Sequence, residues 1–151
     1  MGLQRPTRIP MTATAHILLT GATGYIGSHT CLALQAAGFE VVGVDDFSNS
    51  SPEVLSRLAR LSGRKPLFER ADVGDAAAMS AIFERYRVGA VVHFAAFKAV
   101  GESVAKPLDY YRNNIGGLLN VCRTMRAHGC QRIVFSSSAA SSRIGRLCGS
   151  P

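Results

Sequence analysis

The chain has 151 residues, 47% of them hydrophobic and 18% charged, which suits one globular domain with a buried core and excludes a disordered or collagen-like chain. A formal charge of +7 would favour nucleic acid or a membrane surface as a partner. Four arginines lie in terminal segments that hold no acidic residue, and without them the charge falls from +7 to +3. These are Arg5, Arg8, Arg143 and Arg146. We therefore expect no nucleic-acid partner.

Cysteine usage and the lengths of the apolar runs exclude further classes of protein. The cysteines are Cys31, Cys122, Cys130 and Cys148. They show no C-x-x-C spacing and no flanking histidine pattern, so we expect no metal site and no disulfide framework. No stretch approaches the ~18 apolar residues of a membrane span, and residues 1–14 lack the apolar run of a signal peptide. We expect a cytoplasmic protein with a flexible leader at 1–14. We interpret the leader as an untrimmed start, with Met11 as an alternative initiator; the other interpretation is a transit peptide.

The first half of the chain alternates short apolar runs with segments of helical period. AHILLT at 15–20 predicts a buried strand, and EVVGV at 40–44 predicts a second one. Between them, residues at three- and four-residue steps predict a helix that ends at Gly38. Its expected inward positions are Ile26, Thr30, Leu34 and Ala37.

A second helix is predicted over 51–63. Ser51 is suited to cap this helix, with Pro52 at its first position and Gly63 at its end. Its expected inward positions are Val54, Leu55, Leu58 and Leu61. PLFERA at 66–71 predicts a third strand.

The same alternation continues through the second half of the chain. Asp75 is suited to cap a helix with one apolar face. That face consists of Met79, Ile82, Phe83 and Tyr86. AVVHFAA at 90–96 predicts a strand buried on both sides, and RIVFSS at 132–137 predicts a fifth strand. A long helix over 107–128 connects the two.

Strands that alternate with helices are joined by right-handed crossovers, which give a parallel sheet with helices on both faces. The sequence therefore predicts an α/β protein built on a doubly wound parallel sheet of five strands that is incomplete at its C-terminal edge. The alternative is a helical bundle with short hairpins. That alternative requires the β-branched runs at 41–44 and 91–92 to be accidental.

A glycine motif, TGATGYIGSH at 20–29, lies between the first predicted strand and the first predicted helix. Gly21, Gly24 and Gly27 let the backbone turn tightly and approach a pyrophosphate, whose charge is met by free N–H groups at the helix N-terminus. The spacing is G-x-x-G-x-x-G, which points toward the short-chain dehydrogenase/reductase superfamily and a Rossmann-like domain. Glycines that serve packing alone are the alternative.

Acidic residues after the second and third strands fit the adenosine end of a dinucleotide. Asp45 follows the glycine turn by ~20 residues, where a carboxylate accepts hydrogen bonds from the ribose hydroxyls and repels a 2′-phosphate. NAD is therefore favoured over NADP. Its neighbour Asp46 can instead be a solvated turn residue. Asp72 and Val73 are placed to meet the adenine, although Asp-Val-Gly is also an ordinary turn.

Four stretches resemble the NAD-dependent UDP-glucose 4-epimerases, in order and with compatible spacing, between His16 and Ala139. They are GATGYIGSHT, VDDFSNS, HFAAFKAVGESVAKPLDYYRNN and FSSSA. The resemblance implies an isomerase that keeps NAD bound, oxidises C4 of a UDP-hexose to a ketone, lets the ketose turn over and returns the hydride to the opposite face. It thus implies interconversion of UDP-glucose and UDP-galactose, and a homodimer for the complete protein.

The resemblance also implies roles for single residues. Lys98 matches a lysine that contacts the nicotinamide ribose, and Ser138 matches a catalytic hydroxyl that hydrogen-bonds the sugar oxygen at C4. A surface lysine and serines that end a strand are the alternatives. Further matches to cofactor contacts are Tyr25 and Ile26 at the pyrophosphate, Asn49 and Ser50 at the adenosine, and Asn113 on the long helix.

The match ends before the position of that family's catalytic base. The family continues S-A-T-V-Y-G after the serines and later supplies a Y-x-x-x-K pair, whose lysine lowers the pKa of the tyrosine so that the phenolate accepts the C4 proton. Tyr25, Tyr86, Tyr110 and Tyr111 lack a lysine four residues later. We expect an NAD-binding domain over 15–139, an aberrant tail at 140–151 from a frameshift or truncation, no substrate domain, and no activity of this chain alone.

Two other functions fit parts of the same pattern. One is another nucleotide-sugar enzyme of the superfamily, such as a 4,6-dehydratase or a decarboxylase, against which the KAVGES segment argues. The other is a non-catalytic NAD-binding fragment or interaction module. Binding of NAD without turnover would favour the latter.

Overall fold

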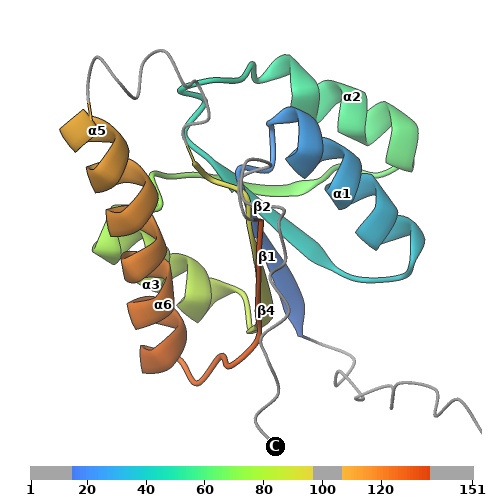
Figure 1. The fold of residues 1–151 in the computed structure, drawn as a ribbon. Coiled ribbons are helices and arrows are strands. Elements are labelled where there is room, and N and C mark those ends of the chain that lie inside the picture. Colours follow the sequence, from blue (N-terminus) through green and yellow to red (C-terminus); the bar gives the residue numbers. More distant parts are fainter. Residues whose placement is uncertain (1–14, 97–106, 137–151) are drawn as a thin grey trace, which may run out of the picture.

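The computed structural model describes residues 15–96 and 107–136, apart from the side chain of Tyr110. Within this part, five parallel strands form one sheet in the order β3-β2-β1-β4-β5 (Figure 1). The strands are β1 (His16–Thr20), β2 (Val41–Asp45), β3 (Leu67–Arg70), β4 (Val88–His93) and β5 (Ile133–Phe135). The chain moves outward from β1 to β3 and then returns to β4 on the other side of β1. This is the doubly wound, Rossmann-like topology that the sequence predicts.

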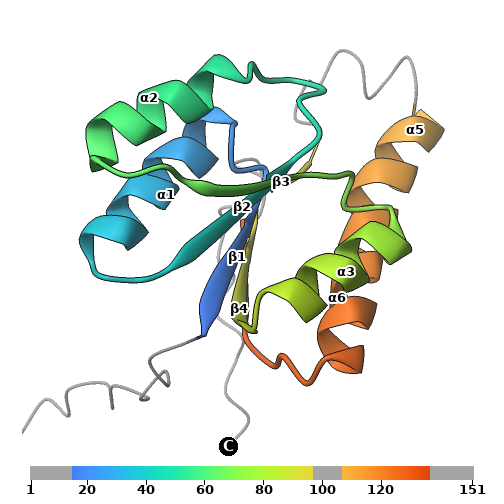
Figure 2. The same ribbon diagram turned by 180° about the vertical axis from the view of Figure 1, so that it is seen from behind.

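Helices cover both faces of the sheet (Figure 2). On one face lie α1 (Tyr25–Ala36) and α2 (Glu53–Ser62). On the other face, α3 (Ala76–Arg85) packs beside a helical segment made of α5 (Pro107–Tyr111), η1 (Arg112–Gly116) and α6 (Gly117–Ala127). Each face of the sheet therefore has its own helical layer, as right-handed crossovers require.

The core consists of two apolar layers, one on each side of the central strands. Side chains alternate along a strand, so Leu18 packs toward α3 and α6 while Ile17 and Leu19 pack toward α1 and α2. Met79 on α3 and Cys31 on α1 are among the buried helix residues that pack against these two sets. The strands β1, β2 and β4 are thus buried on both sides, which explains why they read as continuous apolar runs.

Capping signals act at three predicted helix ends. The Asp75 carboxylate accepts a hydrogen bond from the Ala78 N–H at 3.0 Å, and Gly63 ends α2 with φ 72°. The Ser51 hydroxyl accepts from the Glu53 N–H at 3.3 Å. Pro52 has helical dihedral angles, although α2 begins at the next residue, one position later than predicted.

The predicted inward face of α1 is partly wrong: Leu34 packs against the core as predicted, but Ile26 and Ala37 do not lie inward. The buried residues are Gly27 and Cys31, whereas Ile26 is 46% exposed and Ala37 is exposed. The cause is the close approach of Gly27 to the glycine turn, where an added Cβ would collide with the Gly21 carbonyl oxygen. Because Gly27 faces the turn, its neighbours on the helix lie further outward. Leu61 was also expected inward but is 73% exposed, because α2 packs against α1 and buries only Leu58 fully.

The long helix predicted over 107–128 is helical over 107–127, but it is not α-helical throughout. A π-helical turn, η1, interrupts it and contains Asn113. Directly after this turn, a Cβ on Gly117 would lie 2.9 Å from the Val73 Cγ2, so α6 passes very close to the loop that follows β3. Single π-helical turns inside α-helices frequently occur at functional sites.

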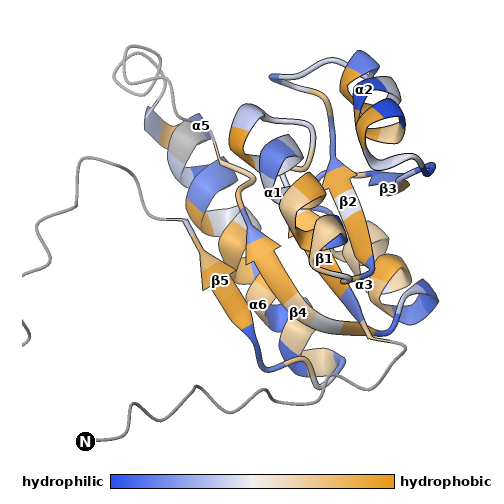
Figure 3. Cartoon of the chain, turned by 90° about the vertical axis from the view of Figure 1, so that its right-hand side faces the viewer, coloured by the Kyte–Doolittle hydropathy of each residue, from blue (hydrophilic) through white to orange (hydrophobic). Residues whose placement is uncertain are grey.

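The edge strand β5 is more exposed than the rest of the sheet. Ile133, Val134 and Phe135 are 39%, 61% and 52% exposed, and Figure 3 shows their hydrophobic colouring beside β4. The predicted strand was longer, at 132–137, and β4 begins at Val88 rather than at residue 90. None of the helices in the described ranges is long and apolar enough to span a membrane.

Candidate functional site

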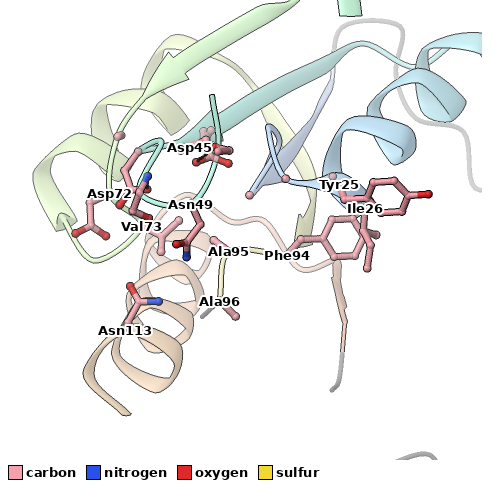
Figure 4. A pocket seen from close by; sticks show the side chains of 18 residues that line it. Tyr25, Ile26, Asp45, Asn49, Asp72, Val73, Phe94, Ala95, Ala96 and Asn113 are labelled. Carbon is pink, nitrogen blue, oxygen red and sulfur yellow. Dashed lines mark hydrogen bonds between the residues drawn. The ribbon is translucent and has the colours of Figure 1, made fainter. Parts of the chain in front are cut away.

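A pocket of about 480 Å³ opens at the carboxyl ends of the strands (Figure 4). Ligands of open α/β sheets bind at this edge, where the strand order reverses. The cofactor-binding residues predicted from the sequence line it: Gly21, Gly24, Tyr25, Ile26, Gly27, Asp45, Asn49, Ser50, Asp72, Val73 and Asn113. Lys98 and Ser138 were also predicted as site residues and lie outside the described residues.

The three glycines of the turn have different reasons to be glycine. Gly21 has φ 67°, and a Cβ there would lie 2.8 Å from the Ala95 nitrogen. A side chain on Gly27 would collide with the Gly21 carbonyl oxygen. Gly24 has φ −68°, and its nearest obstacle, the Gly21 oxygen, is 3.3 Å from an added Cβ. Packing therefore accounts for Gly21 and Gly27, whereas Gly24 leaves open backbone on the pocket wall.

The N-terminus of α1 forms the adjoining wall of the pocket. The first N–H groups of a helix have no partner within it and carry partial positive charge, which favours an anion. Residues Tyr25 and Ile26 supply such groups, and the Tyr25 side chain is 82% exposed against His29. Figure 4 shows Tyr25, Ile26 and Phe94 together, at the opposite end of the pocket from Asp45.

Asp45 is held in place by three donors. Its Oδ2 accepts from the Thr23 N–H at 3.1 Å, while Oδ1 accepts from the Phe47 N–H at 2.9 Å and from the Ser50 hydroxyl at 3.4 Å. A carboxylate has about four acceptor positions, so one position on Oδ2 stays open toward the pocket. The carboxylate can therefore accept one further hydroxyl without losing an internal bond.

Two loops close the remaining sides of the pocket. The Asp72 carboxylate accepts from the Gly74 N–H at 2.8 Å, which is the turn geometry that the sequence left open as an alternative. Val73 is buried, and its carbonyl accepts from the Asn120 side chain at 2.7 Å. Asn113 projects from η1 toward these loops in Figure 4. The pocket thus combines an anion-binding helix end with a preorganised carboxylate.

Comparison with known proteins identifies the family. The model of the NAD dependent epimerase/dehydratase family matches residues 17–145, which is most of the chain. The chain belongs to this family. The match continues past residue 139, where the sequence resemblance was expected to end.

Individual members of the family are similar to the chain at high identity. The UDP-glucose 4-epimerase of Bacillus subtilis is 50% identical over 123 residues, which cover 82% of this chain and 36% of that protein. A UDP-glucose 4-epimerase structure from Stenotrophomonas maltophila, with bound NAD and formylated UDP-arabinopyranose, matches with a TM-score of 0.81 at 44% identity and covers 83% of this chain and 38% of that one. The Bifidobacterium longum enzyme, in complex with NAD+ and UDP, matches with a TM-score of 0.80 at 42% identity, over 83% and 37%. The chain spans little more than a third of the length of these relatives.

The pocket of this chain is also lined by residues that the sequence pattern does not predict as cofactor contacts. Phe94, Ala95 and Ala96 continue β4 past its last paired residue and line the pocket beside the glycine turn. They were read as the end of a buried strand. The signal that could have identified them is their position, since residues just beyond the carboxyl end of a central strand face the binding edge.

No group of three or more His, Cys, Asp or Glu side chains in the described ranges is arranged to hold a metal ion. The described thiols Cys31, Cys122 and Cys130 are free, and burial raises the pKa of the Cys31 thiol. Among the described residues, the chemistry of the site therefore lies in backbone N–H groups, the carboxylates of Asp45, Asp46 and Asp72, and neutral polar side chains.

Proposed function

We propose that this chain forms the NAD-holding part of a UDP-glucose 4-epimerase, which interconverts UDP-glucose and UDP-galactose. The observation that carries the proposal is the pocket that joins the glycine turn to Asp45, in a chain 50% identical to such an enzyme. When bound, NAD supplies the nicotinamide that takes up a hydride from C4 of the sugar and returns it. A cytoplasmic location belongs to the same proposal.

The residues of the pocket fit the parts of NAD in order. The open backbone at Gly24 and the N–H groups at the start of α1 suit the pyrophosphate. The free acceptor position on Asp45 suits a ribose hydroxyl, with Asn49 and Ser50 beside it and Asp72 and Val73 at the adenine. Asn113 is proposed as a further cofactor contact on the side of the pocket where Asp72 and Val73 lie, and Lys98 is assigned to the nicotinamide ribose.

The catalytic proton transfer needs groups that these 151 residues do not contain. Ser138 is proposed to hydrogen-bond the C4 oxygen, but a serine hydroxyl without a paired base does not accept its proton at neutral pH. No tyrosine here is followed four residues later by a lysine. General-base catalysis contributes about 10²–10⁴ in rate, so the chain alone is proposed to bind NAD and to leave UDP-galactose unchanged.

The test compares this chain with a fusion in which residues 15–139 precede the C-terminal two thirds of the Bacillus subtilis relative. Both are assayed for conversion of UDP-galactose to UDP-glucose with excess NAD. Activity confined to the fusion, and lowered by Ser138→Ala, is the expected result. Turnover by the 151 residues alone would contradict the assignment, and so would a fusion that binds NAD but forms a different product.

A homodimer of the complete protein is proposed from an apolar stripe on the helical segment 107–127. The stripe consists of Leu108, Tyr111, Ile115 and Leu119, spaced by three, four and four residues and each at least 49% exposed. This spacing places the four side chains along one face of a helix, where a second copy of the same helix can cover them. Sedimentation of the complete protein distinguishes a dimer from a monomer.

A further inference from the structure

A polar pair is buried beneath the pocket, between the carboxyl ends of β1 and β4. Thr20 and His93 are 0% and 1% exposed, and the Thr20 Oγ1 lies 2.8 Å from the His93 Nδ1. The same Oγ1 accepts a hydrogen bond from the Ala95 N–H at 3.3 Å, and the Thr20 carbonyl accepts from the Phe94 N–H at 3.1 Å. Two side chains and three backbone groups therefore connect the two strands where the ladder ends.

One bond in this group has a fixed direction, because a backbone N–H only donates and Thr20 Oγ1 therefore accepts from Ala95. The hydroxyl keeps one lone pair and its own hydrogen, so the direction of its bond to His93 depends on the tautomer; with the ring hydrogen on Nε2, the hydroxyl donates to Nδ1. Burial lowers the pKa of His93 to about 4, which keeps the ring neutral at neutral pH. Phe135 stacks on the ring, with centroids 6.0 Å apart and an interplanar angle of 18°, and limits its rotation.

A purely structural role explains this pair poorly. The His93 Nε2 is buried and has no hydrogen-bond partner within the described ranges, and a buried polar group without a partner is destabilising. An apolar residue at this position of β4 would avoid that cost, since Val91 and Val92 before it are buried in the same strand. The histidine is therefore expected to contribute something other than stability.

The pair lies directly behind the two walls of the pocket. Thr20 precedes Gly21, and His93 precedes the stretch Phe94 to Ala96. The two walls touch backbone to backbone, because a Cβ on Gly21 would lie 2.8 Å from the Ala95 nitrogen. A small shift of the Ala95 backbone would consequently alter the width of the pocket next to the glycine turn.

We propose that His93 is a positioning residue for the dinucleotide. With its ring hydrogen on Nε2, it accepts a hydrogen bond from the Thr20 hydroxyl at Nδ1, directs a lone pair of that hydroxyl at the Ala95 N–H and sets the distance between the 94–96 wall and the glycine turn. This inference rests on the proposed NAD site. It assigns to His93 an effect on NAD affinity that passes through Thr20.

The test measures NAD affinity by calorimetry in single and double variants of the chain. His93→Leu and Thr20→Val are each expected to raise the Kd about tenfold, and the double variant no further, because both remove the same connection. His93→Asn, whose amide oxygen can replace Nδ1, and Thr20→Ser are expected to stay within about threefold of the original Kd. Unchanged affinity in His93→Leu, or losses that multiply in the double variant, would overturn the proposal.

A second measurement separates this proposal from the proposed function. In the unmodified chain, nitrogen NMR shifts of the His93 ring should show hydrogen on Nε2 and none on Nδ1. The Ala95 amide resonance should move in His93→Leu and return in His93→Asn. If the unmodified chain binds no NAD, the proposed function fails, and with it the effect on affinity. An Ala95 amide that does not respond to His93→Leu overturns the positioning role even if NAD binds.

Discussion

At the scale of single residues, we propose that Asp45 decides which dinucleotide fits the pocket. Its carboxylate is fixed by Thr23, Phe47 and Ser50 and cannot easily turn away from a 2′-phosphate. Juxtaposed like charges cost several kcal/mol, so NAD should bind at least about tenfold more tightly than NADP. Asp45→Arg should narrow or reverse this preference. Titration of both proteins with both dinucleotides measures it, and equal affinities in the unmodified chain would remove the role given to Asp45.

The second and third glycines of the motif, Gly24 and Gly27, are expected to separate binding from folding. Gly24→Ala should change the free energy of unfolding by less than about 1 kcal/mol, because an added Cβ meets only the Gly21 oxygen at 3.3 Å. Its NAD affinity should nevertheless fall about tenfold, since the methyl group occupies the approach of the pyrophosphate. Gly27→Ala should instead destabilise the fold by about 1–3 kcal/mol or more, because it drives a methyl group into the Gly21 carbonyl.

Chemical denaturation and NAD titration of the two glycine variants test this difference. Equal losses of stability would show that Gly24, like Gly27, serves packing. That outcome would favour the packing alternative that the motif alone leaves open.

His93 makes stability depend on pH in the acid range. Its folded-state pKa of about 4 lies below the ordinary 6.5. Above pH 6.5 the ring is neutral in both the folded and the unfolded chain, so its titration does not change the free energy of unfolding there. As the pH falls from 6.5 toward 4, the unfolded chain binds a proton that the folded chain does not, and stability is lost. The full effect is about 3 kcal/mol.

Comparison with His93→Asn isolates this contribution from that of the carboxylates. The difference in free energy of unfolding between the two proteins should change steadily from pH 7 to pH 4, in favour of the variant. A difference that is independent of pH would mean that His93 is not buried as a neutral ring.

At the scale of secondary structure, the exposed edge strand β5 should promote self-association. In the described part of the sheet, β5 is an edge strand, so its outer N–H and C=O groups can pair with another chain. The side chain of Val134, which is 61% exposed, adds apolar surface at this edge. Val134→Lys should reduce the apparent molar mass in light scattering at high concentration. Leu61→Lys on α2 is the matched control, because Leu61 is 73% exposed away from any sheet edge and its replacement should change little. A monodisperse monomer before any substitution would contradict this expectation.

The elements that sequence pattern predicts well are those whose apolar residues face two layers at once. Runs such as that around Leu18 and Val91 are buried on both sides and identify the central strands without tertiary information. The π-helical turn at Asn113 and the rotation of α1 escaped prediction because each depends on a contact distant in sequence. Gly117 meets Val73, and Gly27 meets the Gly21 carbonyl. The polar role of His93 was hidden for the same reason, since its partner Thr20 is 73 residues away.

At the scale of the whole molecule, the binding edge collects contributions from five separate segments of the chain. The glycine turn and Asp45 were predictable because their spacing follows a recurring βαβ unit. The wall at Phe94 to Ala96 was not predicted, because apolar residues after a strand look like more strand. The pocket and the family both point to a dinucleotide, and the chain covers 36% of the length of the Bacillus subtilis relative.

The central claim is that this chain binds NAD in the pocket at the carboxyl edge of its sheet. Titration of the 151-residue chain with NAD, followed by amide NMR, tests it most directly. We predict that amide chemical shifts change saturably in three segments: Gly21 to Gly27, Asp45 to Ser50 and Phe94 to Ala96. The amide shift of Asp75, the distant cap of α3, should change little. Absence of saturable binding, or shifts that gather away from these three segments, would contradict the claim.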